Sequence, residues 1–337
     1  MNKFSFFEAT SIEEALKQVN ATVSETIQPG TIPESSVLKA GGIDLLDLMK
    51  EGISKPDKLV SIQSVGGLDQ IKFDEKEGLR IGATVTLSDI ATDERIKKSY
   101  FALHQAALQA ATPQIRNMAT LGGNLAQRTR CWYFRSKYHE CYRKGTTTCF
   151  AQIGENEYHG IINNSNCASV HSSSLATSLM AFDAAIEITG LEGKVKIVSI
   201  NDFFVNPDID PKRENILEAN EIITAVVLPK VTDKIMSHYL KMGERESHDW
   251  PIAEVAIVAE IKNQKCKKAN IVLGAAAPVP FRAKAAEELL IGKEINPDMA
   301  EAAGVAAMKN ATPLSQNAYK VPIFETIIRR AIEASLC

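Results

Sequence analysis

Residues 121–131, LGGNLAQRTRC, begin with a glycine turn and end at the first cysteine of the chain. Three more cysteines follow as far as Cys167 with the spacing C-x9-C-x7-C-x17-C, so four of the six cysteines lie in one window of the sequence. Buried thiols that serve only packing do not gather in this way. The window therefore predicts a glycine turn that holds a cofactor and, directly after it, a loop that holds a metal cluster.

The composition is that of an ordinary globular protein. With 337 residues, 45% of them hydrophobic and 23% charged, the chain is long enough for two or three packed units. The net charge is -3 and the basic residues are dispersed along the sequence. This pattern gives no electrostatic basis for binding nucleic acid or an anionic membrane surface, so neither is expected as a partner.

The first residues, MNKFSFFEATSIEEAL, contain neither the apolar core nor the cleavage site of a signal peptide. The longest apolar runs, such as residues 253–259, are too short to span a bilayer, so no membrane insertion is expected. A cytoplasmic, reducing compartment is the default expectation. In that setting clustered cysteines more often bind metal or carry out redox chemistry than form structural disulfides.

A second glycine turn lies earlier in the chain. Residues 35–40 have the pattern of an apolar strand that ends at Gly41 and Gly42, and residues 43–50 have helical periodicity. This geometry receives phosphate, because the glycines permit close approach and the free N–H groups of a helix N-terminus favour an anion. An ordinary tight turn has the same pattern, so the residues alone leave both interpretations open.

The remaining patterns predict a mixed chain of helices and strands, with residues 201–215 as a loop and a boundary at residues 231–234. After this boundary we expect a separate α+β unit that ends in two or three helices. Strands are expected at residues 4–7, 58–62, 79–83, 194–200 and 221–228, helices at 12–19, 86–99 and 100–111, a helix then a strand within 172–189, and strands or helices at 235–242, 252–262 and 269–275.

Residues 127–167 contain few apolar side chains, and so long a polar stretch in a compact domain is usually functional or disordered. Four thiolates can bind zinc or an iron–sulfur cluster. Zinc ribbons favour paired C-x2-4-C knuckles, which are absent from this sequence, so the spacing favours iron–sulfur, with zinc, disulfides or free thiols as alternatives. His139 and His159 could replace a cysteine, but unclaimed surface histidines are the simpler interpretation.

Four motifs occur in a fixed order: AGG-x-[DN]-L at residues 40–45, TLGGN at 120–124, EIITAVVLP at 221–229 and K-x3-R-x3-D from Lys241 to Asp249. In this order the chain resembles, over essentially its whole length, the FAD-binding subunits of the xanthine dehydrogenase, or molybdenum hydroxylase, family. The resemblance implies an α+β fold. A two-lobed FAD-binding domain of the p-cresol methylhydroxylase type would come first, followed by a C-terminal α+β domain like that of the CO dehydrogenase flavoprotein. The implied limits are residues 1–230 (lobe one about 1–60, lobe two about 61–230) and residues 231–337.

The cysteines indicate which members of the family this chain resembles most. Most members of the family pass almost directly from GGN to a Ser-Asp flavin contact, whereas an insert intervenes in this chain at about residues 127–170. It is similar to the [4Fe-4S]-bearing insert in the flavin subunits of periplasmic-type aldehyde oxidoreductase and of 4-hydroxybenzoyl-CoA reductase, and it agrees better with the first. The resemblance implies a [4Fe-4S] cluster with four ligands, Cys131, Cys141, Cys149 and Cys167.

The resemblance also implies an FAD site. Residues 40–45 would cradle the pyrophosphate, the TLGGN turn would line the flavin and phosphates, a serine pair would replace the Ser-Asp contact, and residues 223–224 and a lysine would lie near the ring. The implied contacts are Ala40, Gly41, Gly42, Ile43, Asp44, Leu45, Thr120, Gly123, Asn124, Ser173, Ser174, Ile223, Thr224 and Lys241.

Two of these residues depart from the family pattern. Ile43 replaces the usual hydroxyl residue of the glycine turn, which removes one hydrogen bond to phosphate. Ser174 replaces the usual Asp, so the side chain that makes this contact is shorter and carries no charge. Because backbone N–H groups can still hold a pyrophosphate, weakened contacts are expected rather than loss of FAD.

The implied function is that of an oxidoreductase subunit. A molybdopterin-binding large subunit would oxidise an aldehyde or aromatic substrate, so no catalytic residue is assigned to this chain. Electrons would pass through [2Fe-2S] centres of a small subunit to FAD and on to an external acceptor that the sequence does not identify. A signal on a partner subunit could carry the complex to the periplasm.

Several charged or aromatic residues have two interpretations. Lys241 would stabilise anionic reduced flavin or be a solvated surface lysine. Trp250 would lie over the flavin or in an ordinary core or interface position. Four basic residues near the cysteines would offset the negative charge of a cluster, or form a solvated face or a subunit contact: Arg128, Arg130, Arg143 and Lys144.

Two functions of other classes compete with this interpretation. A standalone flavoprotein oxidoreductase, of the related cell-wall-enzyme type, would turn over substrate by itself, but it has no use for four loop cysteines. A non-enzymatic zinc-binding or interaction module would be colourless. Neither accounts for the glycine turns and the cysteines together.

Overall fold

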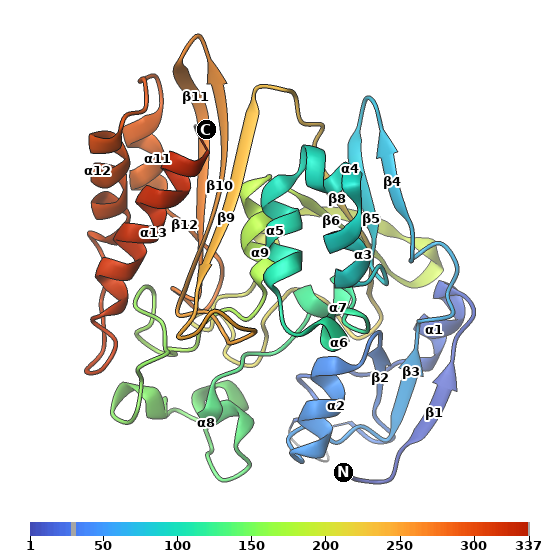
Figure 1. Ribbon diagram of the computed structural model, residues 1–337. Coiled ribbons are helices and arrows are strands. Elements are labelled where there is room, and N and C mark those ends of the chain that lie inside the picture. Colours follow the sequence, from blue (N-terminus) through green and yellow to red (C-terminus); the bar gives the residue numbers. More distant parts are fainter. Residues whose placement is uncertain (28–31, 336–337) are drawn as a thin grey trace.

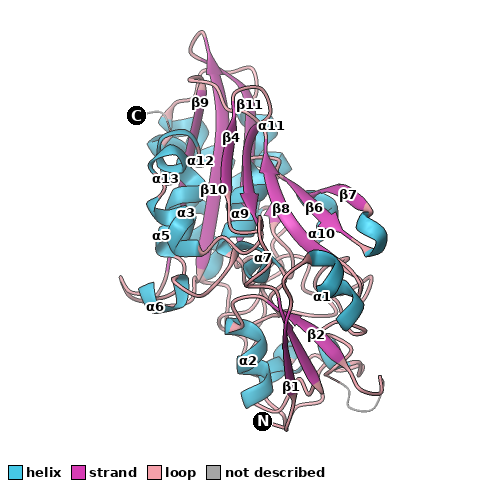
Figure 2. Ribbon diagram, turned by 90° about the vertical axis from the view of Figure 1, so that its right-hand side faces the viewer, coloured by secondary structure: helices cyan, strands magenta, loops and turns pink. Residues whose placement is uncertain are grey.

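The computed structural model describes residues 1–27 and 32–335. Within these residues the strands form three sheets, and helices cover their faces (Figures 1 and 2). The first sheet is small and parallel, with the order β1-β3-β2. Its elements and helices are β1 (Ser5–Glu8), α1 (Ile12–Gln18), β2 (Ser36–Lys39), α2 (Ile43–Lys50) and β3 (Lys58–Ser61).

The small sheet has a core on each face. Successive side chains of a strand point to opposite faces, so Val60 packs in the core beneath α1 and Leu59 in the core beneath α2. Helix α1 begins at Ser11, whose Oγ accepts the N–H of Glu14 at 3.1 Å. Helix α2 begins directly after the paired glycines, as the sequence predicts.

The second sheet is antiparallel throughout, with the order β4-β5-β8-β6-β7. Its strands are β4 (Ile71–Asp74), β5 (Gly78–Gly82), β6 (Ala185–Thr189), β7 (Val195–Ser199) and β8 (Ile222–Leu228). The associated helices are α3 (Leu87–Thr92), α4 (Glu94–Ser99), α5 (Phe101–Gln109), α9 (Ser174–Ala181) and α10 (Ile200–Phe203). The expectation that residues 201–215 are entirely loop is wrong at their start, because the Oγ of Ser199 accepts the Asn201 N–H at 3.2 Å and begins α10.

The third sheet, order β12-β11-β10-β9, is also antiparallel. Its strands are β9 (Ile235–Met242), β10 (Ala253–Lys262), β11 (Lys265–Gly274) and β12 (Phe281–Arg282), and the helices α11 (Lys284–Leu290), α12 (Pro297–Met308) and α13 (Lys320–Ala334) complete the chain. The three stretches that the sequence left as strand or helix are therefore all strands.

Strand β10 is buried on both faces. In Figure 1 the strand lies between the C-terminal helices and α5 and α9. Val255 and Ile257 pack against the C-terminal helices, whereas Ala256 and Val258 share a core with α5 and α9. The residues after 231 thus have their own sheet and helices. The sequence suggested that this unit is separate, but it is not separate in its packing, because β9–β11 close the core of the preceding part. The domain limits at residues 230 and 231 stay a prediction.

Residues 127–170, called the cysteine loop below, connect α7 (Leu121–Leu125) to α9 and contain only α8 (Trp132–Arg135) and two short 3-10 turns, η1 (Tyr142–Lys144) and η2 (Phe150–Gln152). In Figure 1 this loop lies below the C-terminal helices and beside α2. Its second half is tied to the segment between α12 and α13: the N–H of Thr312 donates to Ile161 O at 2.7 Å, and the N–H groups of Asn156 and Gln316 each donate to the other side chain, at 3.1 and 2.9 Å.

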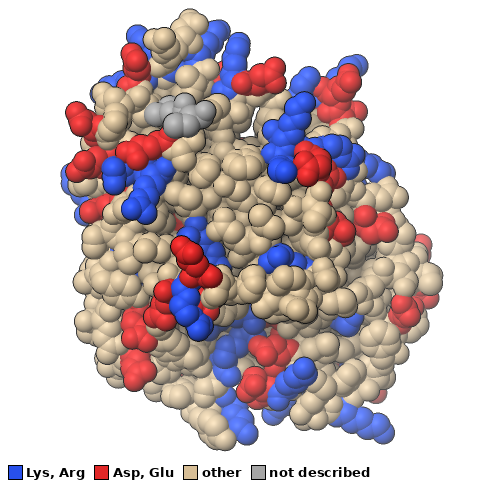
Figure 3. Space-filling model, in the orientation of Figure 1, with Lys and Arg blue, Asp and Glu red and all other residues tan. Residues whose placement is uncertain are grey.

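Charged side chains of both signs are interspersed over the face shown in Figure 3, and a broad uncharged area lies between them. Among the described residues visible in this view, Lys and Arg form no continuous patch. Within the described ranges, no helix combines the length and hydrophobicity needed to cross a bilayer.

Candidate cofactor site

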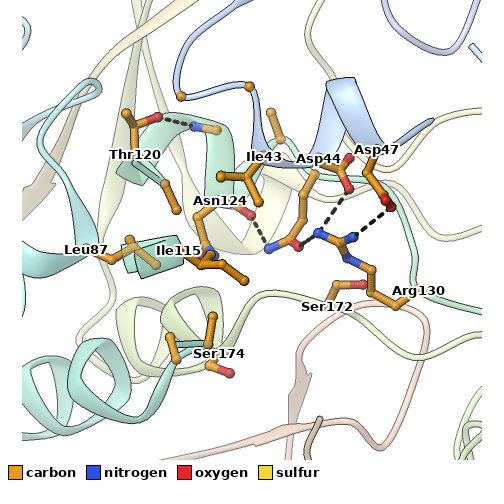
Figure 4. A pocket seen from close by; sticks show the side chains of 18 of the residues that line it. Ile43, Asp44, Asp47, Leu87, Ile115, Thr120, Asn124, Arg130, Ser172 and Ser174 are labelled. Atoms are coloured by element: carbon orange, nitrogen blue, oxygen red, sulfur yellow. Dashed lines mark hydrogen bonds and ion pairs between the residues drawn. The ribbon is translucent and has the colours of Figure 1, made fainter. Parts of the chain in front are cut away.

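A cavity of about 470 Å³, the large cavity, lies where the small parallel sheet meets the rest of the molecule. Its walls come from the turn before α2, from the helix N-terminus of α7, from the start of α9 and from the β9–β10 connection. Figure 4 shows side chains from these elements around it, among them Ile43, Thr120, Asn124 and Ser174. Eleven of the fourteen predicted FAD contacts line it: Ala40, Gly41, Gly42, Ile43, Asp44, Leu45, Thr120, Gly123, Asn124, Ser174 and Lys241.

The N-terminus of α2 presents free amide groups to this cavity. Gly42 is its N-cap, with φ of 81° in the left-handed region that glycine adopts without strain, and no side chain caps the helix. Within the described residues, the N–H groups of residues 43–45 have no hydrogen-bond partner, because the first bond within the helix is from Leu46 N–H to Gly42 O, at 2.9 Å. Three amides and the positive end of the helix dipole therefore face a site suited to an anion.

The two glycine turns lie directly against each other. A Cβ added to Gly41 would lie 1.9 Å from Met118 O, so only glycine permits this approach. Thr120 is the N-cap of α7, and its Oγ1 accepts the N–H of Gly123 at 3.3 Å. The turn that the sequence placed at residues 120–124 is thus the first turn of a short helix.

The serine pair has two different positions. Ser173 is the buried N-cap of α9; its Oγ donates to Asn124 Oδ1 at 2.5 Å and so orients that amide, but Ser173 is not on the wall of the large cavity. Ser174 is on the wall, and its Oγ donates to the carboxylate of Glu254.

The two predicted contacts on β8, Ile223 and Thr224, also differ in position. Ile223 lines a smaller adjoining cavity of about 170 Å³, which shares Ala40 and Gly123 with the large one. Thr224 lines neither cavity, since its Oγ1 donates to Glu187 Oε1 at 2.7 Å, on the opposite face of β8. A side-chain contact from Thr224 to a ligand in these cavities is therefore not supported by its position.

Lys241 lies on the wall and is half-buried, so the interpretation as a solvated surface lysine is wrong. Its Nζ donates to Gln109 O at 3.1 Å. Burial lowers the pKa of Lys241, while the carboxylates of Glu254 and Asp249 act in the opposite direction. Trp250 is 58% exposed and lines the cavity mouth, with the guanidinium carbon of Arg130 at 5.1 Å from the centre of its ring, so it is not a core residue.

Arginines of the cysteine loop bind the first turn of α2. Arg135 forms ion pairs with Asp44 at 2.5 Å and Asp47 at 3.0 Å. Arg130 pairs with the same carboxylates at 3.1 and 3.5 Å, as Figure 4 shows. The N–H of Arg128 donates to Asp44 Oδ2 at 2.9 Å. The Asp44 carboxylate is thereby neutralised, so this residue can offer its backbone N–H to a phosphate without repelling it.

The four cysteines of the loop converge. Cys131, Cys141, Cys149 and Cys167 together line one small cavity of about 10 Å³, with aromatic rings and Arg143 around them. The five cysteines among the described residues are free thiols, so the disulfide interpretation is not borne out for them. No three His, Cys, Asp or Glu side chains of residues 1–27 and 32–335 are arranged to hold a single metal ion.

The environment of the thiols is mixed. Burial raises the pKa of Cys131 to about 12. A hydrogen bond from the Cys149 thiol, with the nearby Arg143 guanidinium, lowers the pKa of Cys167 to about 5 although burial opposes this. His159 is buried, with Nε2 3.2 Å from the Cys131 sulfur, and burial lowers its pKa to about 4. The interpretation of His159 as an unclaimed surface residue is therefore wrong.

The basic residues around the cysteines are not a solvated face. Arg128 and Arg143 are each 3% exposed, and both pair with the buried carboxylate of Glu214. Lys144 is also buried, and its Nζ donates to two loop carbonyls, Ser136 O at 2.5 Å and His139 O at 2.8 Å. Sequence reasoning missed Arg135, Asp47, Glu214 and Glu254, whose partners lie far away along the chain and leave no local pattern.

Comparison with known proteins agrees with this geometry. Residues 2–231 match the family model described as "FAD binding domain in molybdopterin dehydrogenase", and residues 238–335 match "CO dehydrogenase flavoprotein C-terminal domain". The chain belongs to this family. It is an FAD-binding subunit of the xanthine dehydrogenase and CO dehydrogenase type, which confirms the predicted family, fold class and FAD.

Relatives within the family are similar over most of the chain. The FAD-binding subunit PaoB of an Escherichia coli K12 aldehyde oxidoreductase is 32% identical over 90% of this chain and 92% of its own. An Escherichia coli O157:H7 xanthine dehydrogenase FAD-binding subunit is 24% identical over 94% of each chain. A carbon monoxide dehydrogenase structure from Hydrogenophaga pseudoflava has a TM-score of 0.73 at 22% identity, covering 99% of this chain and 98% of its own, which shows a shared fold.

Proposed function

We propose that this chain is the FAD- and [4Fe-4S]-containing electron-transfer subunit of a molybdenum-cofactor-dependent dehydrogenase that oxidises an aldehyde or an aromatic substrate. The observation that carries the proposal is the convergence of four cysteines of one loop on a single cavity, and two of them, Cys131 and Cys141, pack with Leu48 of α2. The name of the relative with 32% identity supports the aldehyde class.

A molybdopterin-binding large subunit and a [2Fe-2S] small subunit would oxidise the substrate and relay its electrons to this chain. The names of relatives as FAD-binding subunits and medium chains support a complex of several subunits. FAD, when bound, would supply a centre that takes up electrons one at a time and releases them in pairs to an external acceptor.

The residues on the cavity wall fit FAD. The free amides of residues 43–45 would hold the pyrophosphate at the N-terminus of α2. The large cavity of about 470 Å³ lies in the usual range for cofactor sites, and the smaller one adjoins it, so a long dinucleotide could occupy both. Asn124, held by Ser173, would offer a fixed amide to the ligand.

Lys241 is one of the cations on the wall, which is also lined by Lys39 and Arg130. Because it is half-buried and its ammonium is fixed to Gln109 O, it would place positive charge where the flavin ring gains electrons. A fixed charge in a site of low polarity stabilises a developing negative charge more strongly than solvent does. Trp250 and Arg130 would shield this side of the site from water.

The cysteine loop fits a cluster by its donor set. Cys131, Cys141 and Cys149 are each the residue directly before a short helical turn, so the free amides of that turn lie beside the sulfur. The guanidinium of Arg143 lies near the Cys167 sulfur, and its buried charge would offset that of four thiolates. Aromatic side chains close the cavity and would exclude water from the ligands.

The test is an absorption spectrum of anaerobically purified protein, with iron, zinc and flavin quantified on the same sample. We expect about one FAD and about four irons per chain, with a shoulder near about 400 nm that bleaches on reduction. Cys149→Ser should lose the iron and keep the flavin. Cys266→Ser is the matched control, because Cys266 is fully buried in β11 and away from the loop, and it should keep both.

Three outcomes would separate the alternatives. Flavin without iron in wild type would leave the FAD site standing and refute the cluster. A colourless protein that contains zinc would refute the proposal as a whole. Substrate oxidation by the isolated chain would show a standalone flavoprotein.

A further inference from the structure

Glu254 is a buried carboxylate behind the wall of the large cavity. It lies on β10, is 1% exposed and does not itself line the cavity. The hydroxyl of Ser174 donates to its Oε1, and the hydroxyl of Thr177 donates to Oε2 at 3.5 Å. The buried Tyr239 hydroxyl lies beside it as well. Nothing in the assigned FAD site uses this group.

The fold makes room for this side chain. Glu254 pairs with Gly274 of β11 across the sheet, and a Cβ on Gly274 would lie 2.1 Å from the carboxylate oxygen. Any other residue at position 274 would therefore displace the carboxylate. Burying such a group is unfavourable unless partners compensate for the lost water, so a site formed for it by two donating hydroxyls and a glycine points to a role.

Both neighbours of Glu254 toward the cavity are wall residues. Ser174 is one of them. The other is Lys241, which is paired directly with Glu254 in the register of β9 and β10 and so extends from the same face of the sheet. Burial raises the pKa of Glu254, and burial lowers that of Lys241. Each of the two charges is therefore stabilised by the other in an environment that disfavours both.

The hydrogen bond to Glu254 determines what Ser174 can do. A hydroxyl has one proton, and here it is directed away from the cavity into the carboxylate. The oxygen that Ser174 presents to a ligand then has only lone pairs available, so it can accept a hydrogen bond from an O–H or N–H group but cannot donate one.

We propose that Glu254 is a positioning residue of the FAD site: it orients the Ser174 hydroxyl as an acceptor toward the cofactor and holds Lys241 in place as a cation beside it. The inference rests on the proposed use of this cavity for FAD. On this proposal the negative charge near this wall belongs to Glu254 of β10, which lies behind Ser174, the residue that would contact the cofactor.

The test moves the charge between the two positions. In Glu254→Gln the size is kept, but the amide can donate to Ser174 and reverse its hydroxyl, so FAD affinity should fall by about tenfold, the worth of one hydrogen bond. Ser174→Asp alone sets a second carboxylate against Glu254 and should also weaken FAD binding. The double variant, Ser174→Asp with Glu254→Ser, restores one carboxylate at the wall and should bind FAD within about threefold of wild type.

Affinity is measured by titrating the flavin-free full-length chain with FAD and following flavin fluorescence, with thermal unfolding of the same samples without FAD. The matched control is Glu260→Gln, on the same strand and partly exposed, which should bind FAD like wild type. The pattern of two weak single variants, a restored double variant and an unchanged control supports the proposal.

Other patterns overturn it. Wild-type affinity in Glu254→Gln would show that the carboxylate does not position Ser174. A double variant that stays weak while its unfolding temperature falls would show a purely structural role. A wild-type chain that binds no FAD would overturn both this inference and the proposed function, whereas the first two results would leave the proposed function intact.

Discussion

Replacing Gly41 by alanine should separate the two glycine turns that form the large cavity. The new Cβ would lie 1.9 Å from Met118 O and 2.9 Å from Met118 C, both backbone atoms that no side-chain rotation can remove. Ordinary contact begins at 3.4 Å, so the turn before α2 and the chain before α7 must move apart by about 1.5 Å.

The magnitude follows from this displacement. Forcing extra volume into a packed contact costs about 1–3 kcal/mol, and a backbone contact lies at the upper end. We therefore expect Gly41→Ala to lower the free energy of unfolding by about 3 kcal/mol. Because the amides of residues 43–45 would move with the turn, FAD affinity should also fall by at least about tenfold, equivalent to about 1.4 kcal/mol.

Two glycines of the same domain provide matched controls in urea unfolding and FAD titration. Gly66→Ala places its Cβ in open space at a φ that other residues adopt, and should change neither quantity. Gly52→Ala also meets no atom, but its φ is 71°, so it should cost about 1 kcal/mol of stability and leave FAD affinity unchanged. If Gly41→Ala unfolds and binds FAD like Gly66→Ala, the contact between the two turns is not what shapes the cavity.

Two further results are expected. Arg135→Met removes the ion pairs to Asp44 and Asp47 and should lower the free energy of unfolding by about 2 kcal/mol. Arg329→Met breaks a more exposed ion pair on α13 and should lower it by less than about 0.5 kcal/mol. Equal losses for the two variants in urea unfolding would contradict this prediction. Lys320 is fully buried between two carbonyl groups, and burial lowers its pKa to about 7. In the unfolded state the pKa of a lysine is about 10.4, so between these two values the unfolded state binds more protons than the folded state. The contribution of Lys320 to the free energy of unfolding should therefore rise as the pH increases from about 7 to about 10. The free energy of unfolding, measured by urea unfolding at several pH values between about 7 and about 10, should therefore rise less steeply with pH in Lys320→Met than in wild type. An unchanged dependence on pH would show that Lys320 does not cause the rise.

Elements whose boundaries depend on neighbouring residues could be predicted from the sequence. The helix expected at residues 43–50 is α2 to the residue, because the glycine pair, the apolar periodicity and the lysine in the last turn all act locally. The strand at 221–228 was likewise recognisable from its β-branched residues and from Pro229. The stretch 253–259 remained ambiguous, since a strand buried on both faces is apolar at every position and shows no period.

The chemistry of the site depends on contacts that local patterns do not encode. Arg135 and Asp44 are 91 residues apart, and Ser174 and Glu254 are 80 apart. The family resemblance correctly indicated most residues of the cavity wall, but it also included Thr224. A motif identifies positions in the sequence and does not tell in which direction each side chain points. The burial of His159 was also hidden, as it depends on aromatic rings and on Lys320 of α13.

The connection of the cysteine loop to the segment between α12 and α13 has a consequence for biosynthesis. Residues 156–164 are held by Thr312 and Gln316, which the ribosome adds more than a hundred residues after the last loop cysteine. During translation all four thiols are therefore present on a loop that is not yet fastened. A chain cut short before residue 312 would therefore keep all four loop cysteines and still lack the contacts that close the loop.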